Sequence, residues 1–401
     1  MEQAFSPAIG HKATSTTCHQ AVRGQSVKAA PWPAVEKARE FRALVADAKR
    51  RIGNGVEWYP YDTLSALAHF DRLLGAANRH LLEPREGARR VLDLGCGDGE
   101  MSLFLEWLGF EVVAADHPRY NHNGMRGVRA LRDELGSRME IREIDLDALT
   151  FPHGSYDLII LLGVLYHLRN PFYALEQMAR YGTRCLLSTR VAGRLPGGKS
   201  LPKEAAWAYL LDENEIAGDD SNYFVFSHAA LRRLLKRTHW RVLDYLNTGA
   251  TGNSEPVRLD RDERVFCLIQ SEHDRLADLE LGEGWYRREE TGWRWTRRNF
   301  SAMVPAPCSK GPLELAMEVY VSDELLRRQE RFQLAIAVNG TPLAPAVFTH
   351  AGAETIAREL PAIADRTLRL DCATNACLAP DASDPRERGI VVSSVRVTAR
   401  K

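Results

Sequence analysis

The chain has 401 residues, of which 45% are hydrophobic, so it is long enough for two or three domains with sizeable cores. Its 53 Lys and Arg residues equal its 53 Asp and Glu residues, and the formal net charge is zero. This balance argues against a globally basic nucleic-acid-binding protein, although a local basic patch stays possible.

The cysteines and the apolar runs indicate the compartment. The 7 cysteines are scattered and form no CxxC pair, which is typical of a reducing cytoplasm and argues against a disulfide framework or a zinc site. We therefore expect no metal. The longest apolar run, from Leu158 to Leu165, is far shorter than the roughly 20 residues that cross a bilayer. Residues 1–30 lack the apolar segment of a signal peptide. We expect this start to be disordered, and the protein to be cytoplasmic without a membrane span.

Residues 31–80 are predicted to form a helical extension. Apolar residues recur at helical spacing from Pro33 to Arg51, and Asp62 can cap a second helix. Between them lies an aromatic segment that includes Trp58 and Tyr61. This segment could close over a bound ligand and contact the substrate. It could equally fill the space between the two helices as a hydrophobic plug.

A strand, a glycine turn and a helix follow in direct succession. The apolar strand Arg90–Leu94 leads through Gly95-Cys96-Gly97 into the helix Met101–Leu108. This unit lets the backbone approach a ligand and aims a helix N-terminus at it. A dinucleotide fingerprint needs Gly or Ala where this chain has Glu100, so Asp93 and Glu100 together favour a ligand with a cationic centre. The pattern Asp-x-Gly-x-Gly resembles motif I of class I S-adenosylmethionine (SAM) methyltransferases. The other interpretation is a tight turn in a different α/β domain.

Acidic residues end the next two predicted strands. The strand Glu111–Ala115 is followed by Asp116, where such folds place the carboxylate that accepts the ribose hydroxyls. The strand Met139–Ile144 is followed by a turn expected to hold the adenine. Asp145 is the preferred acceptor from its exocyclic amine, and Asp147 is the alternative.

The fourth predicted strand, Tyr156–Leu162, leads into a segment where the methyl acceptor is expected. His167 could act as a general base on an acceptor hydroxyl, or it could pack against the following helix and bond the backbone. Tyr166 could orient the acceptor or place its ring against a sulfonium, or it could be a core residue. We predict both as catalytic residues.

The rest of the sheet is predicted with a long interruption. Strands are expected at Cys185–Val191, Trp240–Tyr245 and Arg264–Ser271. Residues 192–226 read as an excursion that could form a lid, and Tyr223 near its end is a candidate substrate-binding residue. The polar insertion Asn247–Glu263 is a candidate substrate wall.

The composition changes after Glu272, where short alternating runs bounded by turn residues predict a β-sandwich over residues 282–401. Asn339-Gly340 between two such runs predicts a hairpin. The segment Trp285–Phe300 interleaves arginines with aromatic residues. It could bind a glycan or RNA, or form a solvated edge of the sandwich.

With these residues in hand, the chain resembles a class I SAM methyltransferase over roughly residues 55–270. Within that class, Gly163-Val164-Leu165-Tyr166-His167 followed by Arg169-Asn170-Pro171 resembles the tRNA wobble-uridine (carboxymethyl) transferase-like family. The resemblance implies an α/β, doubly wound Rossmann-like sheet over residues 81–272. It also implies a SAM site, whose expected residues are Asp93, Gly95, Cys96, Gly97, Asp116, His117, Asp145, Leu146, Leu162 and Gly163.

The chain departs from the tRNA family next to Trp58. Those enzymes place basic residues there to hold the extra carboxylate of carboxy-SAM, whereas no Lys or Arg lies between Val56 and Thr63. Plain SAM is therefore expected. The C-terminal part resembles a β-domain attached to enzymes of bacterial surface-polysaccharide clusters, on Gly284-Trp285-Tyr286, Trp293-Arg294-Trp295 and Asp384-Pro385-Arg386.

These observations predict a SAM-dependent methyltransferase that acts on a small molecule or a saccharide intermediate, at oxygen. The sandwich would help to bind substrate or to assemble a homo-oligomer. One alternative is a tRNA wobble-uridine modifier, which the zero net charge disfavours. Another is a protein that has kept a SAM pocket without catalysis.

Overall fold

The structure is a computed structural model, and it describes residues 32–75, 78–83, 89–148, 151, 156–216, 218–277, 279–289, 293–307, 311–329, 331–361 and 365–399. The predicted disorder of residues 1–30 lies outside this part of the chain. Within it, no helix is long and apolar enough to cross a membrane. The same residues contain no group of three or more His, Cys, Asp or Glu that could hold a metal ion.

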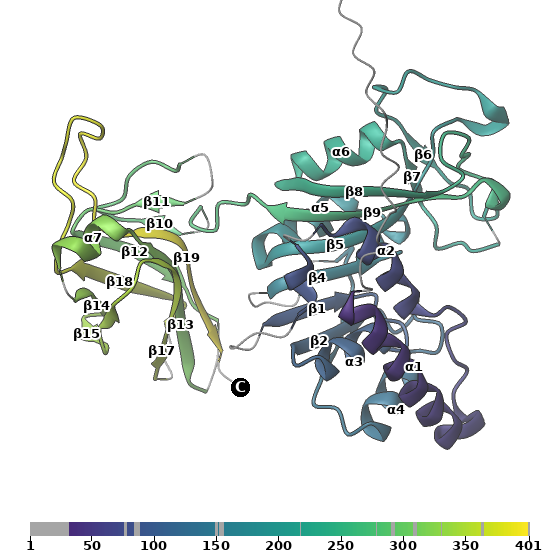
Figure 1. Cartoon of the computed structure of the whole chain (residues 1–401), viewed down its shortest axis with the longest axis horizontal. Helices are drawn as coiled ribbons and strands as arrows, with labels where there is room; N and C mark the ends of the chain where they lie inside the picture. The colour runs from purple at the N-terminus through teal and green to yellow at the C-terminus, as the bar shows by residue number, and fades with distance from the viewer. Residues whose placement is uncertain are drawn as a thin grey trace, which may run out of the picture.

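A nine-stranded sheet with helices on both faces forms the larger part of the molecule (Figure 1). Parallel strands run in the order β3-β2-β1-β4-β5, and then β9 and β8 extend the sheet as antiparallel neighbours. The order reverses beside β1, which creates the switch point where α/β folds bind ligands. The strands are β1 (Arg90–Leu94), β2 (Glu111–Asp116), β3 (Glu140–Glu143), β4 (Tyr156–Leu162), β5 (Gly182–Val191), β8 (Trp240–Gly249) and β9 (Glu263–Ser271).

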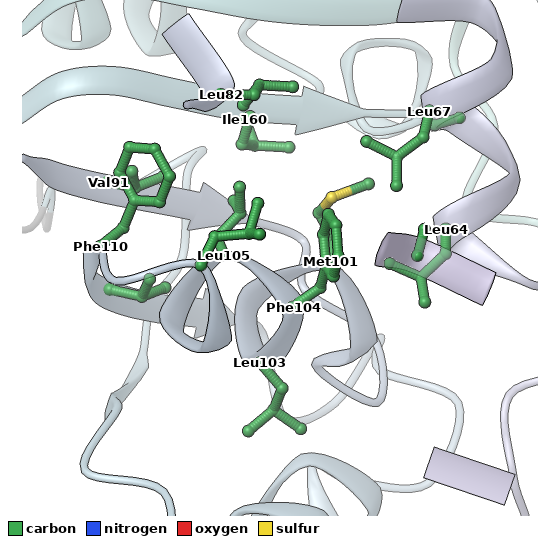
Figure 2. Packing of buried hydrophobic residues seen from close by; sticks show 14 of the residues in the cluster. Leu64, Leu67, Leu82, Val91, Met101, Leu103, Phe104, Leu105, Phe110 and Ile160 are labelled. Atoms are coloured by element: carbon green, nitrogen blue, oxygen red, sulfur yellow. The ribbon is translucent and has the colours of Figure 1, made fainter. Parts of the chain in front are cut away.

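Each face of this sheet has its own hydrophobic core. One core joins the sheet to α1 (Pro33–Ile52), α2 (Ala66–Leu73), α3 (Glu100–Trp107) and α4 (Arg126–Glu134). Figure 2 shows how Met101, Phe104 and Leu105 of α3 face Val91 and Ile160 of the strands. The second core holds α5 (Pro171–Tyr181) and α6 (His228–Arg237). The N-terminal helices therefore share a core with the sheet.

The strands that flank the glycine turn form where the sequence predicts them. Both β1 and β4 have the predicted bounds, because each is an apolar run buried between two layers of helices. Helix α4 was not predicted, since its buried face consists only of Gly127, Val128 and Leu131. The excursion after β5 contains a short antiparallel pair, β6 (Ala208–Leu210) and β7 (Phe224–Phe226).

The C-terminal part consists of two antiparallel sheets around one core, as expected for a β-sandwich. The six-stranded sheet contains β10 (Glu280–Leu281), β12 (Asn299–Pro305), β14 (Phe332–Val338), β15 (Thr341–Pro342), β16 (Ala346–Phe348) and β18 (Thr367–Thr374). The four-stranded sheet contains β11 (Arg294–Trp295), β13 (Leu313–Val321), β17 (Gly352–Leu360) and β19 (Val391–Ala399), and the short helix α7 (Asp323–Arg328) follows β13. The predicted hairpin at Asn339-Gly340 is confirmed, since both residues have positive φ and Val338 pairs with Thr341.

Arginines of the basic aromatic segment are engaged within the protein. Tyr286 lies between the guanidinium groups of Arg297 and Arg386, at 5.6 and 5.3 Å from its ring centroid. Arg294 donates to Asp274 at 2.7 Å. These contacts favour the interpretation that the segment stabilises the sandwich edge, rather than that it presents free cations to RNA.

Candidate active site

A cavity with an empty volume of about 950 Å³ opens at the carboxyl ends of β1, β2, β3 and β4. This is the switch point of the sheet, where ligands of such folds bind. Sequence-predicted residues that line it are Gly95, Gly97, Asp116, His117, Asp145, Leu146, Leu162, Gly163, His167 and Tyr223. Five predicted residues do not line it: Asp93, Cys96, Tyr166, Trp58 and Tyr61.

The glycine turn after β1 forms one wall from backbone alone. Gly95 and Gly97 have φ values of 76° and 59°, which L side chains rarely adopt. A Cβ on Gly95 would lie 2.3 Å from Cγ2 of Val164, and a Cβ on Gly97 would meet the ring of Tyr59 at 3.6 Å. The positive φ favours glycine at both positions, and at Gly95 the close approach of Val164 leaves no room for a side chain.

Asp116, at the end of β2, is held in the wall by three hydrogen bonds. Its carboxylate accepts from the N–H of Gly97 at 2.9 Å, from Nδ2 of Asn121 at 2.8 Å and from the N–H of His117 at 2.7 Å. Burial raises the pKa of Asp116, and these donors oppose that rise. The result is a fixed acceptor that faces the cavity.

Asn121 is a site residue that the sequence analysis missed. Its amide donates both to Asp116 and to the carbonyl of Gly97, the latter at 3.1 Å. Its oxygen accepts from the N–H of Asn123 and Met125. Asn121 thereby locks the β2 loop to the glycine turn, a link between two segments that no local pattern in the sequence reveals.

The two acids after β3 have different partners. Both oxygens of Asp147 accept backbone N–H groups, from Arg169 at 3.0 Å and from Asn170 at 2.7 Å. Asp145 directs one oxygen to within 3.7 Å of Nε2 of His117 at the cavity wall. Asp147 is thus occupied in holding the β4 turn, and Asp145 is the better placed to receive a ligand.

Asp93 and Cys96 are corrections to the predicted cofactor site. The alternation of β1 puts Asp93 on the same face as Val91, toward α3, where it accepts from Oγ of Ser102 at 2.5 Å. Asp93 is 4% exposed, and burial raises its pKa to about 7. The Cys96 side chain is buried in the same core, and burial raises the pKa of its thiol. Neither side chain reaches the cavity.

The aromatic segment contributes Tyr59 rather than Trp58 or Tyr61. Trp58 packs against the first core, and Nζ of Lys49 lies 4.9 Å from the centroid of its ring. Tyr61 is 70% exposed and touches the edge of Tyr59. Tyr59 lines the cavity, and burial raises the pKa of its hydroxyl to about 12. The neighbouring residues of an irregular segment point in different directions, so composition alone did not single out Tyr59.

Lys49 also modifies the argument about basic residues near Trp58. No Lys or Arg is adjacent in sequence, but α1 brings Lys49 to the indole ring. Its charge is compensated, because Nζ lies 2.6 Å from Glu100 and 3.8 Å from Asp98. Lys49 does not line the cavity.

Tyr166 lies directly behind Gly163, outside the cavity lining. It is 8% exposed, and its hydroxyl oxygen is 3.4 Å from the position that a Cβ on Gly163 would take. Nη1 of Arg264 donates to this hydroxyl at 3.5 Å. A bare glycine therefore separates the phenol and the guanidinium from the cavity.

The insertion Asn247–Glu263 does not form the predicted substrate wall. None of its residues lines the cavity. Its Asp262 instead pairs with Arg190 at 2.6 Å and with Arg264 at 3.2 Å. The insertion acts on the site indirectly, since it holds Arg264 beside Tyr166.

His167 lies in the turn after β4, half-buried in the cavity wall. Its Nδ1 is 3.0 Å from the main-chain oxygen of Ser221 and 2.9 Å from Oγ of Ser221. Nε2 has no hydrogen-bond partner within the described part of the chain. Burial lowers the pKa of His167, so the imidazole is neutral near pH 7.

Ser221 and Tyr223, near the end of the excursion at residues 192–226, line the cavity next to His167. The N–H of Tyr223 donates to the carbonyl of Tyr166 at 2.8 Å, and Nε of Arg169 donates to the Tyr223 hydroxyl at 2.8 Å. Arg169 also reaches the hydroxyl of Tyr120 at 3.4 Å. Residues 221–223 are thus bonded along the turn that carries His167.

Comparison with known proteins agrees with this geometry. Residues 67–245 match a family model described as a methyltransferase domain. This part of the chain is similar to methyltransferase domains. The match spans β1 to β7, the glycine turn and the residues that line the cavity, apart from Tyr59.

Curated proteins are similar to this chain over shorter stretches. A ubiquinone biosynthesis O-methyltransferase of Roseobacter denitrificans is 28% identical over 132 residues, which is 32% of this chain and 50% of the relative. One from Ruegeria pomeroyi is 31% identical over 111 residues, covering 28% and 41%. The 27-O-demethylrifamycin SV methyltransferase of Amycolatopsis mediterranei is 26% identical over 110 residues, covering 27% and 38%. The matched stretch spans half or less of these relatives.

Two solved structures show a distant likeness. The N-terminal domain of EvdMO1, in the presence of SAH and D-fucose, is 18% identical, with a TM-score of 0.38, and the match covers 57% of this chain and 96% of that one. TehB from Haemophilus influenzae is 21% identical, with a TM-score of 0.33, and the match covers 46% and 58%.

The residues of this cavity fit a SAM-type cofactor. Asp116 is a fixed acceptor suited to ribose hydroxyls, and Leu146 and Leu162 supply apolar surface suited to adenine. The turn at Gly95 and Gly97 leaves no side chain between backbone and ligand.

Proposed function

We propose that the protein transfers a methyl group from SAM to a hydroxyl of a small molecule or a saccharide intermediate, with His167 as the general base. The observation that carries the proposal is the neutral imidazole at the cavity wall, bonded through Nδ1 and open at Nε2. The O-methyltransferase names of the similar proteins support oxygen as the acceptor atom.

One wall of the cavity would hold the cofactor, and the other would face the acceptor. Gly95, Gly97, Asp116 and Asp145 would hold SAM, which supplies a methyl group on a positively charged sulfur that takes the electron pair of the broken bond. The hydroxyl of the acceptor would face His167. Positioning of the acceptor can supply most of the acceleration, and a base is needed because the hydroxyl proton must leave as the new bond forms.

His167 must be unprotonated before the reaction in order to act as a base. A buried imidazole is harder to protonate than an exposed one, and the pKa of His167 is lowered for this reason. The base is therefore available throughout the neutral range, and it becomes an imidazolium when it takes the proton at Nε2.

Equilibrium binding is the first test. SAM, SAH and carboxy-SAM are titrated into the purified chain, with Asp116→Ala beside it. We expect micromolar binding of SAM and SAH, lost in the variant, and no preference for carboxy-SAM. A clear preference for carboxy-SAM would instead favour the tRNA wobble-uridine reaction. No binding of any of the three would overturn the proposal.

Activity is then tested on a panel of phenols, sugars and nucleotide sugars. His167→Gln should lose about 100-fold or more in kcat on any acceptor found, the usual contribution of a general base. Binding of SAM should stay within about twofold, because His167 faces the acceptor side. Binding of SAM without turnover of any hydroxyl would favour a protein that has kept the pocket without catalysis.

A further inference from the structure

The hydrogen bonds of His167 determine which ring nitrogen carries the proton. Nδ1 lies 3.0 Å from the main-chain oxygen of Ser221. A carbonyl oxygen can only accept, so Nδ1 must be the N–H donor. In the neutral imidazole, Nε2 is then the nitrogen with the free lone pair.

The hydroxyl group of Ser221 and the carboxylate of Asp219 also require Nδ1 of His167 to be the hydrogen-bond donor. Oγ of Ser221 donates its single proton to Oδ1 of Asp219 at 2.5 Å, and the N–H of Ser221 donates to the same oxygen at 2.9 Å. Burial raises the pKa of Asp219, but the hydrogen bonds from Ser221 outweigh this, and the pKa lies below the ordinary value. The ionised carboxylate cannot donate. With its proton committed to Asp219, Oγ can only accept from His167, at 2.9 Å.

We infer that Asp219 and Ser221 are positioning residues that hold His167 in the Nδ1–H tautomer and aim Nε2 at the acceptor. The inference rests on the proposed function for its catalytic meaning, but the tautomer itself can be observed without any substrate. Asp219 would also stabilise the imidazolium that forms when Nε2 takes the proton, because its negative charge faces the ring through Ser221.

The positions of these residues in the chain make the general base depend on contact between two segments. Asp219 and Ser221 belong to the excursion after β5, whereas His167 belongs to the turn after β4. The two segments are joined by the bond from Tyr223 to the Tyr166 carbonyl. The base is therefore complete only when the end of the excursion is docked on the β4 turn.

Nitrogen-15 NMR of the histidine-labelled full chain tests the inference. The chain has 12 histidines, and His167→Gln identifies the resonances of His167. We expect Nδ1 of His167 to show the signature of a protonated nitrogen and Nε2 that of an unprotonated one. The opposite assignment would overturn the inference.

Asp219→Asn is the informative variant, and Asp220→Asn is its matched control, since Asp220 is the next residue and is also exposed. In Asp219→Asn the neutral amide oxygen accepts more weakly than the carboxylate, so the Ser221 hydroxyl can also donate to Nδ1, and we expect a larger share of the Nε2–H tautomer. The pKa of His167 should fall further, because a nearby negative charge is lost. Asp220→Asn should leave both unchanged. Equal spectra for the two variants would contradict the role of Asp219.

The pH profile separates this inference from the proposed function. On an acceptor that is turned over, Asp219→Asn should lower kcat roughly tenfold and move the acidic limb of the profile to lower pH, with KM for SAM unchanged. Ser221→Ala should have the same effects on kcat and on the acidic limb, because it removes the hydroxyl group that connects Asp219 to His167 and keeps the main-chain carbonyl. If the tautomer is as expected but His167→Gln keeps full activity, the proposed base is wrong and the positioning stands. If His167→Gln is inactive but Asp219→Asn has the wild-type profile, the positioning is wrong.

Discussion

The backbone N–H of Tyr59 donates a hydrogen bond of 2.7 Å to the carboxylate of Asp98, which lies in the glycine turn. Asp98 is 3% exposed and also accepts from Nδ2 of Asn123 at 2.7 Å. The same amide of Asn123 donates to the carbonyl of Glu57. Residues of the aromatic segment are thereby tied to the turn that would bind the cofactor, and the Tyr59 ring is kept over Gly97.

Asp98→Ala tests this tie. The change removes the acceptor of the Tyr59 N–H and one of the two acceptors of the Asn123 amide, and a lost acceptor typically costs about 1–3 kcal/mol. We expect a lower Tm and roughly tenfold weaker binding of SAM, because Tyr59 is no longer held over the turn. Calorimetric titration and thermal unfolding measure both. Asp47→Ala, on the exposed face of α1, is the control and should leave SAM binding unchanged.

Substitution of Asp145 is expected to change SAM binding, whereas substitution of Asp147 is expected to change thermal stability. Asp145→Asn is expected to weaken SAM roughly tenfold with little change in Tm, since its oxygen faces the cavity wall. Asp147→Ala should instead lower the Tm and disturb the β4 turn, because two backbone N–H groups lose their acceptor. If Asp147→Ala weakens SAM more than Asp145→Asn at equal stability, the choice between the two acids is reversed.

Gly95→Ala should damage both the turn and the cavity. The added methyl group would lie 2.3 Å from Cγ2 of Val164, and the φ of 76° costs about 1–2 kcal/mol for an L residue. We expect a lower Tm and loss of SAM binding at micromolar concentrations. The second change Val164→Ala should recover part of the stability, since it removes the clashing atom. Gly55→Ala, which has open space around it, serves as the comparison and should be neutral.

Asp93 predicts a pH dependence of stability. Its pKa is raised from 3.8 to about 7, so the folded state binds more protons than the unfolded chain between these values. Stability contributed by this group is therefore present at low pH and is lost as the pH rises toward 7. Asp93→Asn, which resembles the neutral carboxyl, should raise the Tm relative to wild type at about pH 8 and much less at about pH 4. An equal change at both pH values would show that Asp93 is ionised in the folded protein throughout.

Several features of the site could be read from local sequence because each depends on neighbours along the chain. Gly95 and Gly97 follow a buried strand, and Asp116 follows the next one. The cap at Asp62 is also local, and its carboxylate accepts from the backbone N–H of Leu64. Parallel strands end at one edge of a sheet, so these residues meet in any fold of this kind.

Other features depend on contacts between distant segments. Asn121 reaches Gly97, Asp98 reaches Tyr59, and Ser221 reaches His167 across 54 residues. Trp58 and Tyr59 are adjacent aromatics, and only the packing of α1 decided that Trp58 faces Lys49 and the core while Tyr59 faces the cavity. No spacing in the sequence distinguishes them.

By itself, the sequence determined the sheet, the glycine turn and the acid after β2, because strand period, turn chemistry and apolar runs are properties of consecutive residues. The tertiary structure decided which side chains face the ligand. In the folded chain Asp93 faces the core and Asp147 accepts backbone N–H groups of the β4 turn. Ser221, near the end of residues 192–226, contacts the imidazole of His167. Orientation follows from side-chain packing between segments far apart in the chain, where hydrogen bonds and buried area choose among directions that the local pattern leaves equal.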